Sequence, residues 1–238
     1  MSNSAQHRAR ICVALDMADA AAAADLARRL HGVVDMVKVG MELFYAAGAE
    51  GYAKVAQAGL PVFLDLKLHD IPNTVARGLT SLLALSPPPA ILNVHASGGP
   101  AMLRAAAQAV DGRAKLVAVT VLTALSGDDL AAIGLAGPPH DAVLRLAALA
   151  RESGLDGVVC SPEEVAAIRA ALGDDFLTIV PGIRPAGAGL NDQKRAATPK
   201  AAQAAGADIL VIGRPITQAP DPVAAAMEIR TALEQSSA

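Results

Sequence analysis

The clearest indication of the fold is the segment from Phe63 to Val75, which reads FLDLKLHDIPNTV. It begins as an apolar strand and ends as the first turn of a helix, because Pro72 is a residue type favoured at the first helical position. Side chains alternate between the two faces of a strand, so Asp65 and Lys67 are predicted to point the same way. Charged groups of both signs at the carboxyl end of a buried strand indicate acid–base chemistry.

Similar short apolar runs recur along the chain, and each is followed by a segment with helical spacing. Strands are predicted at 10–16, 33–40, from 61, and at 91–96, 115–122, 157–160, 177–180 and 207–213. Helices are predicted at 18–30, 44–58 with Gly59 as C-cap, 73–85, 100–110, 141–153, from 161, and at 200–205 and 222–234. Strands that alternate with helices favour a parallel sheet, and eight such units favour a closed, single (β/α)8 TIM barrel. We expect one catalytic domain over residues 1–238.

Polar side chains follow the predicted strands, where the functional groups of this fold gather. They are Asp16, Lys38, Asp65, Lys67, His95, Thr123, Arg184 and Arg214. Barrel closure would bring them to one mouth, and we expect charged lysines between carboxylates. A buried ion-pair network that only stabilises the barrel end is the structural alternative. Asp70 could instead cap the helix that follows it, and His69 and His95 could be a loop and a core histidine.

A second feature at the predicted mouth is the pair Gly213-Arg214 after the last strand. Glycine lets a phosphate approach main-chain N–H groups, and arginine adds a fork of donors. Phosphate sites in this fold favour the loops after strands seven and eight. The glycine-rich, basic segment 181–195 lies in the first of these loops and is long enough to suggest a closing lid. A surface salt bridge is the alternative for Arg214 alone.

The run from Asp65 to Val75 resembles the signature of the orotidine 5′-phosphate decarboxylase family. The resemblance extends over nearly the whole chain. It includes Leu15-Asp16, Val37-Lys38-Val39-Gly40, Val119-Thr120-Val121-Leu122-Thr123, Pro181-Gly182-Ile183-Arg184, Gln193 and Gly213-Arg214. It implies conversion of orotidine 5′-monophosphate (OMP) to uridine 5′-monophosphate (UMP) and CO2, without a metal or organic cofactor. It also implies a homodimer with active sites at the subunit interface.

The resemblance further implies a role for each matched residue. Lys67 would donate a proton to C6 of the pyrimidine, and Asp65 would lie against the substrate carboxylate. Asp70 would complete an Asp-Lys-Asp-Lys array from the partner subunit, with Ile71 and Thr74 beside it.

The remaining matched residues would hold the substrate at its two ends. Lys38 and Asp16 would hold the ribose and orient the charged network. Thr123 would contact the pyrimidine region. The phosphate would be held by Arg184, Gln193, Gly213 and Arg214.

Two other functions fit parts of the pattern. Sugar-phosphate enzymes of the same barrel family, such as a 3-keto-gulonate 6-phosphate decarboxylase, share Asp-x-Lys-x-x-Asp but stabilise an enediolate with Mg²⁺. They typically carry an acidic residue where Lys38 stands, so Lys38 discriminates between the two reactions. A non-catalytic phosphate-binding barrel would need none of these carboxylates.

The amino-acid composition limits the kinds of partner that this chain is expected to bind. The chain has 238 residues and a net charge of −3, which gives no overall attraction for nucleic acid or anionic membranes. Aromatic residues make up only 2% with no Trp, so stacking platforms for single strands are not expected. Cys12 and Cys160 stand in apolar runs and are expected to be buried thiols. Without a predicted secretory signal or membrane span, we expect a cytoplasmic protein.

Overall fold

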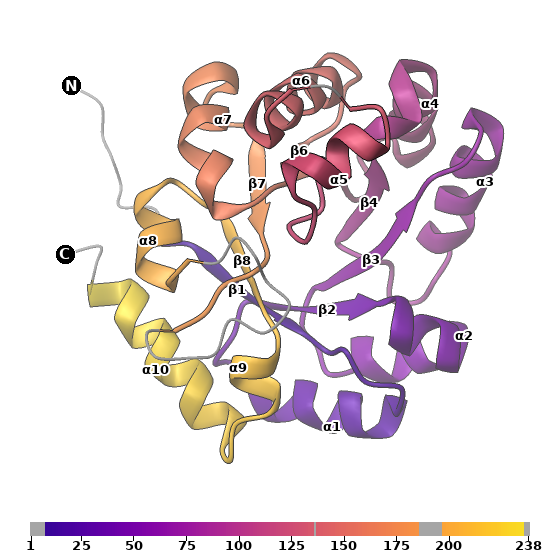
Figure 1. Cartoon of the computed structure of the whole chain (residues 1–238). Helices are drawn as coiled ribbons and strands as arrows, with labels where there is room; N and C mark the ends of the chain where they lie inside the picture. Colours follow the sequence, from indigo (N-terminus) through magenta and orange to yellow (C-terminus); the bar gives the residue numbers. More distant parts are fainter. Residues whose placement is uncertain (1–7, 136, 186–196, 236–238) are drawn as a thin grey trace.

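A computed structural model describes residues 8–135, 137–185 and 197–235 (Figure 1). Its strands are parallel and close in sequence order into a barrel, with β1 paired to β8. The strands are β1 (Arg10–Ala14), β2 (Met36–Gly40), β3 (Val62–Leu68), β4 (Ile91–His95), β5 (Lys115–Val119), β6 (Gly157–Val159), β7 (Leu177–Val180) and β8 (Ile209–Ile212). The closed barrel confirms the predicted (β/α)8 fold.

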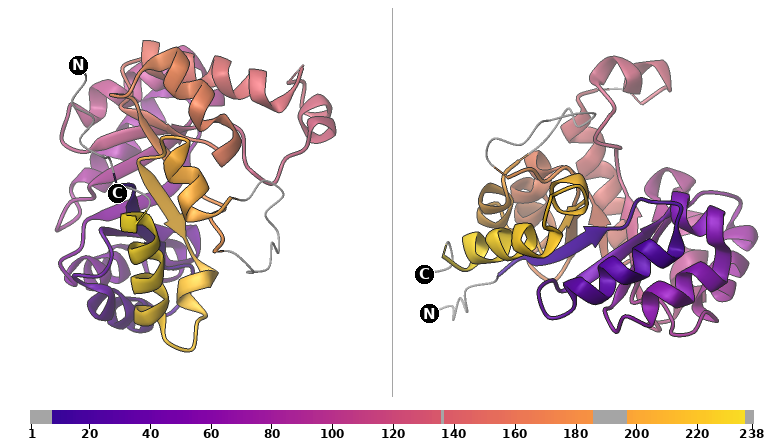
Figure 2. Two further views of the ribbon diagram at one scale, coloured as in Figure 1. Left: turned by 90° about the vertical axis from the view of Figure 1, so that its left-hand side faces the viewer. Right: turned by 90° about the horizontal axis from the view of Figure 1, so that it is seen from below.

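Helices follow every strand and surround the barrel, as the two turned views also show (Figure 2). The α-helices are α1 (Ala20–Leu30), α2 (Met41–Ala56), α3 (Pro72–Leu83), α4 (Gly99–Val110), α5 (Gly127–Ala132), α6 (Pro139–Glu152), α7 (Val165–Leu172), α8 (Pro199–Ala204), α9 (Arg214–Thr217) and α10 (Pro222–Gln235). Two 3₁₀ turns, η1 (Ala96–Gly98) and η2 (Pro162–Glu164), precede α4 and α7.

Three local expectations about the helices are wrong. The sequence predicts neither α5 nor α9, because six and four residues are too few to display a helical period. A capping box between Ser126 and Asp129 starts α5. Helix α2 ends at Ala56 with Gln57 as C-cap, so Gly59 is not the cap and instead turns the chain at φ 81°.

The core has an inner and an outer layer, because successive strand residues face opposite sides. The outer layer packs the strands against the helices. The inner layer fills the barrel with Cys12, Ala14, Met36, Phe63, Ile91, Val117, Ile179, Ile209 and Val211. Two residues beyond Met36, Phe63 and Ile91, the same face carries Lys38, Asp65 and Asn93. The apolar filling thus gives way to a polar layer toward the carboxyl ends of the strands.

Both cysteine thiols are buried, as predicted. At the amino end of the barrel, Arg169 pairs with Asp208 and donates to the carbonyl oxygens of Gly206 and Phe176.

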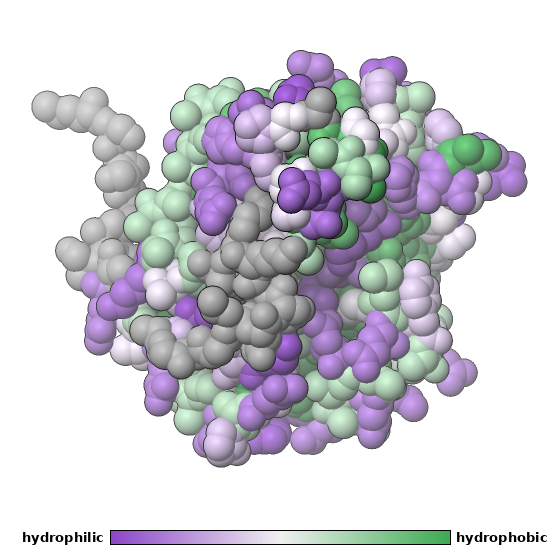
Figure 3. Space-filling model, in the orientation of Figure 1, coloured by the Kyte–Doolittle hydropathy of each residue, from purple (hydrophilic) through white to green (hydrophobic). Residues whose placement is uncertain are grey.

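Hydrophilic and hydrophobic residues are interspersed on the face of the molecule seen in Figure 3. Within the described ranges, no helix is both long and apolar enough to cross a membrane.

Candidate active site

Four predicted site residues form one continuous chain of ion pairs at the carboxyl ends of β1, β2 and β3. The Lys38 ammonium lies 2.8 Å from Asp16 Oδ1 and 3.3 Å from Asp65 Oδ2. The other oxygen of that carboxylate, Asp65 Oδ1, lies 2.7 Å from Lys67 Nζ. Negative and positive groups therefore alternate along the sequence Asp16, Lys38, Asp65, Lys67.

Burial and the neighbouring charges shift the pKa values of Asp65 and Lys38 in opposite directions, and the effect of the charges is the larger one. The side chains of Lys38 and Asp65 are only 10% and 11% exposed. Burial alone would raise the pKa of the Asp65 carboxyl, but Lys38 and Lys67 hold it below its usual range. Burial alone would lower the pKa of Lys38, but Asp65 and Asp16 raise it. Both groups are therefore charged at neutral pH, as the sequence predicts.

Gly40 leaves room for this cluster at the end of β2. A Cβ atom at Gly40 would lie 2.9 Å from Lys38 Nζ and 3.1 Å from Asp16 Oδ1. Both distances are shorter than ordinary van der Waals contact, so a side chain here would displace the ion pair. Glycine at position 40 therefore allows the Lys38 ammonium to lie beside Asp16.

Strand β3 is irregular where it carries the charged residues. Leu64 pairs with Leu92 and Leu68 pairs with Val94, so three residues of β3 face one residue of β4. Lys67 has φ 51°, a left-handed conformation that lysine adopts rarely. The side chains of Asp65 and Lys67, predicted to point the same way along a regular strand, form their ion pair across a bulge instead.

Sequence reasoning missed Asn93, which lies opposite this bulge on β4. Its side chain is fully buried, and its amide bonds to the Asp65 carboxylate and to the main chain of Lys67. The available signal was a single polar residue inside the apolar run 91–96, in phase with His95. We interpreted that run only as a buried strand.

Two cavities open beside the charged cluster, and both are lined by Lys38, Lys67, Pro181 and Val211. The first has a volume of about 170 Å³ and a mainly apolar lining that includes Phe63, Val119 and Leu122, together with the predicted residue Thr123. The second has a volume of about 290 Å³ and a more polar lining. This lining includes the predicted residues Asp16, Arg184, Gly213 and Arg214. The site is therefore apolar at one end and basic at the other, with the lysines between.

The predicted lid segment 181–195 is described only as far as Pro185, and Gln193 lies outside the described residues. Ile183, near the start of the segment, forms an isolated parallel bridge with Ala197, which lies just beyond its end. The Arg184 N–H donates to the Ala197 carbonyl at 2.9 Å. The Arg184 side chain is buried, and its Nη1 donates to the carbonyl oxygen of Ile183.

The structure does not bring Asp70, Ile71 and Thr74 to the cluster of their own chain. All three are exposed, and none lines either cavity. Asp70 forms no ion pair with another described residue, and its Oδ1 accepts from the N–H of Ile71 at 2.6 Å. The alternative that Asp70 caps α3 is wrong, because Ile71 is the N-cap residue and α3 has no side-chain cap.

The two histidines that the sequence left open lie together near the cluster, with ring centroids 5.4 Å apart. Burial, His69 and Lys67 lower the pKa of His95 below its usual value. Neutral His95 is therefore the dominant form at neutral pH.

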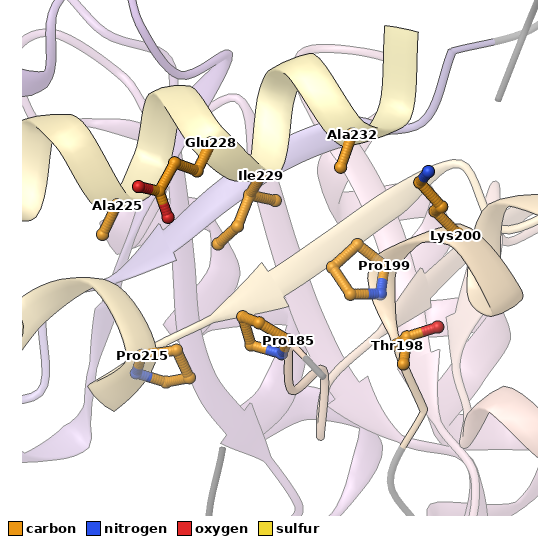
Figure 4. A pocket seen from close by; sticks show the side chains of 9 residues that line it. All are labelled: Pro185, Thr198, Pro199, Lys200, Pro215, Ala225, Glu228, Ile229 and Ala232. Atoms are coloured by element: carbon orange, nitrogen blue, oxygen red, sulfur yellow. The ribbon is translucent and has the colours of Figure 1, made fainter. Parts of the chain in front are cut away.

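A larger cavity, of about 620 Å³, lies elsewhere, between α8, α9 and α10 (Figure 4). Its lining includes Pro185, Pro199, Pro215 and Ile229, and it shares no residue with the two mouth cavities. Size alone therefore does not locate the chemistry, and the Asp/Lys cluster does. Within the part of the chain that the structure describes, no three His, Cys, Asp or Glu side chains are grouped to hold a metal ion.

Known proteins resemble this chain over nearly its full length. A profile of the family described as "Orotidine 5'-phosphate decarboxylase / HUMPS family" matches residues 9–229. An orotidine 5′-phosphate decarboxylase of Anaeromyxobacter dehalogenans is 53% identical over 94% of this chain and 98% of the relative. One of Halorhodospira halophila is 55% identical over 92% and 94%. The crystal structure of the Lactobacillus acidophilus enzyme superposes with a TM-score of 0.79 at 41% identity, covering 94% of this chain and 99% of that one.

Proposed function

The chain belongs to the orotidine 5′-phosphate decarboxylase / HUMPS family and decarboxylates OMP to UMP and CO2, and we propose that the Lys67 ammonium supplies the proton that replaces CO2 at C6. The reaction is the last step of de novo UMP formation in pyrimidine biosynthesis. One observation carries the proposal: Lys67 lies at the junction of the two cavities, with its Nζ 2.7 Å from the Asp65 carboxylate.

The step balances with the groups of the site alone. The bond between C6 and the substrate carboxylate breaks, CO2 leaves, and the electron pair stays on C6. The positive charge of Lys67 stabilises that developing carbanion. The proton then passes from Nζ to C6, and the neutral amine regains a proton from water.

Asp65 contributes by its fixed negative charge beside the leaving carboxylate. Because Lys38 and Lys67 keep the pKa of Asp65 low, the carboxyl stays ionised when substrate binds. Repulsion in the ground state is relieved as CO2 departs. Lys38 is fixed between Asp65 and Asp16 and orients the array.

The two cavities suit the two ends of a nucleotide. We assign the pyrimidine to the apolar cavity, where Thr123 contacts it, and the ribose to Lys38 and Asp16. The phosphate occupies the basic cavity, held by Arg184, Gly213 and Arg214. Gln193, assigned to the same group, completes this set. Phosphate binding far from C6 then provides energy to assemble the charged site.

The proposed reaction needs no metal ion or organic cofactor. The sugar-phosphate enzymes that use Mg²⁺ typically carry an acidic residue at the position of Lys38. In this chain the Lys38 ammonium lies there instead, between two carboxylates. Loss of OMP absorbance with purified protein tests this directly. We expect the same rate before and after EDTA, whereas turnover only with added Mg²⁺ would reject the proposal.

We also infer a homodimer with shared active sites. Asp70, Ile71 and Thr74 follow the catalytic strand but face outward, and Ile71 is 66% exposed. Met41 and Tyr45, which follow β2, are exposed apolar residues as well. A second copy that covers this surface would receive Asp70 as the fourth charge of its Asp-Lys-Asp-Lys array.

Hybrid dimers test the shared site. Lys67→Ala and Asp70→Ala proteins are each expected to be inactive, and mixing them should restore part of the activity in hybrids that contain one intact site. No recovery despite confirmed subunit exchange would contradict the inference.

We further propose that residues 1–238 form one catalytic domain of a cytoplasmic enzyme. Limited proteolysis would test the single domain, and cell fractionation would test the location.

A further inference from the structure

Asn93 occupies the one position of β4 that faces the bulge of β3. Regular pairing would give each residue of β3 one partner on β4, but here Asp65, Leu66 and Lys67 stand opposite Asn93 alone. The bulge removes the main chain of Lys67 from regular pairing with β4. The polar groups in this gap therefore need a partner from a side chain.

The side-chain amide of Asn93 supplies that partner with both of its ends. Its Oδ1 accepts from the main-chain N–H of Lys67 at 2.8 Å. Its Nδ2 donates to Asp65 Oδ1 at 2.7 Å. The partners fix the orientation of the amide, since a main-chain N–H can only donate and an ionised carboxylate can only accept. Asn93 has no exposed surface, so bulk solvent does not compete for either bond.

The two bonds converge on the atoms that the reaction uses. Asp65 Oδ1 receives Asn93 Nδ2 and Lys67 Nζ at the same distance of 2.7 Å. Asn93 also holds the N–H of Lys67 at the left-handed φ of 51°, which a lysine does not favour. One amide thus joins the main chain of the proton donor to the carboxylate against which its ammonium lies.

We propose that Asn93 is a positioning residue for decarboxylation, which sets the Lys67 ammonium and the Asp65 carboxylate at their working distance without touching substrate. The inference rests on the proposed role of Lys67 as proton donor. Asn93 lines neither mouth cavity, so its loss should affect the chemical step more than the binding of the nucleotide.

Steady-state kinetics of Asn93→Ala and the similarly sized Asn93→Leu test this proposal. We expect kcat to fall about 10- to 100-fold, because a displacement of about 1 Å at a reacting group has an effect of this order. KM for OMP and Kd for UMP should change less than about threefold. A purely structural role would lower Tm and leave kcat unchanged in the folded protein.

Val94→Ala is the matched control, because Val94 is the next residue of β4, is fully buried and belongs to the outer core. It should lower Tm and leave kcat intact. If Asn93→Ala and Asn93→Leu do not fold, Asn93→Asp keeps the volume and the oxygen that accepts from Lys67, but loses the donor to Asp65. A loss of kcat at unchanged KM in Asn93→Asp supports the proposal, and wild-type kcat overturns it.

Lys67→Ala, measured in parallel, separates this inference from its premise. If Lys67→Ala is inactive while the Asn93 variants have wild-type kcat, only the role of Asn93 is rejected. If Lys67→Ala retains turnover, the proton-donor role itself is rejected.

Discussion

Replacing Asp65 with asparagine should destabilise the fold, because it removes the carboxylate that two ammonium groups share. Those ammonium groups lie 3.3 Å and 2.7 Å away, on side chains that are 10% and 24% exposed. Breaking a buried ion pair by removing one partner costs about 3–5 kcal/mol. Lys38 keeps its second partner, Asp16, at 2.8 Å, so the lower value of about 3 kcal/mol applies.

Thermal unfolding measures this cost. For a chain of this size, 1 kcal/mol corresponds to about 2–4 °C in Tm, so Asp65→Asn should lower Tm by about 6–12 °C at pH 7. The exposed Asp175, which pairs with Arg151, is the control, and Asp175→Asn should leave Tm unchanged.

The difference between wild type and Asp65→Asn should also depend on pH. The pKa of Asp65 in the folded protein lies below its ordinary value of 3.8, so the unfolded chain binds a proton first as pH falls. The stabilisation is therefore present above about pH 4 and is lost as pH falls through the lowered pKa. An equal or higher Tm for Asp65→Asn at pH 7, or a Tm difference that persists unchanged at pH 3, would show that the Asp65 carboxylate does not stabilise the fold through its ion pairs.

Three further changes test other parts of the site. Arg214→Ala should raise KM for OMP at least about tenfold, because a hydrogen bond to a charged group contributes about 1.5–3 kcal/mol; an unchanged KM would remove Arg214 from the phosphate site. Gly40→Ala should lower kcat/KM with little change in Tm, since the added methyl group displaces Lys38 from Asp16; wild-type kinetics would show that the pair tolerates the shift. His95→Gln should weaken the fall of Tm between pH 7 and pH 5.5, because the lowered pKa of His95 makes the unfolded chain bind the proton more readily; an identical pH dependence would contradict this.

The barrel and most of the charged cluster are predictable from the sequence for one physical reason. Strands of a closed parallel barrel end at the same mouth, so residues that follow separate apolar runs must meet. Asp16 and Lys38 are 22 residues apart in the chain, yet their side chains are 2.8 Å apart. Because the short strands rich in Val, Ile and Leu can be recognised in the sequence, both residues can be predicted to lie at the same mouth of the barrel.

The details that the sequence did not reveal are those that break a regular pattern. The alternation from Leu64 to Leu68 continues without interruption, so nothing marks the bulge or the positive φ of Lys67. Asn93 stands in a run that reads as an ordinary buried strand, and its importance depends on the bulge. Asp70 lies outside the cluster of its own chain, and only the proposed dimer would give it a place in an active site.

OMP turnover by Lys67→Ala beside the wild type shows whether the Lys67 ammonium protonates C6. Binding of UMP to both proteins, measured by calorimetry, shows whether the variant keeps its site. We expect Lys67→Ala to bind UMP yet to show no detectable OMP turnover. Turnover by folded Lys67→Ala at a rate near that of the wild type would contradict it.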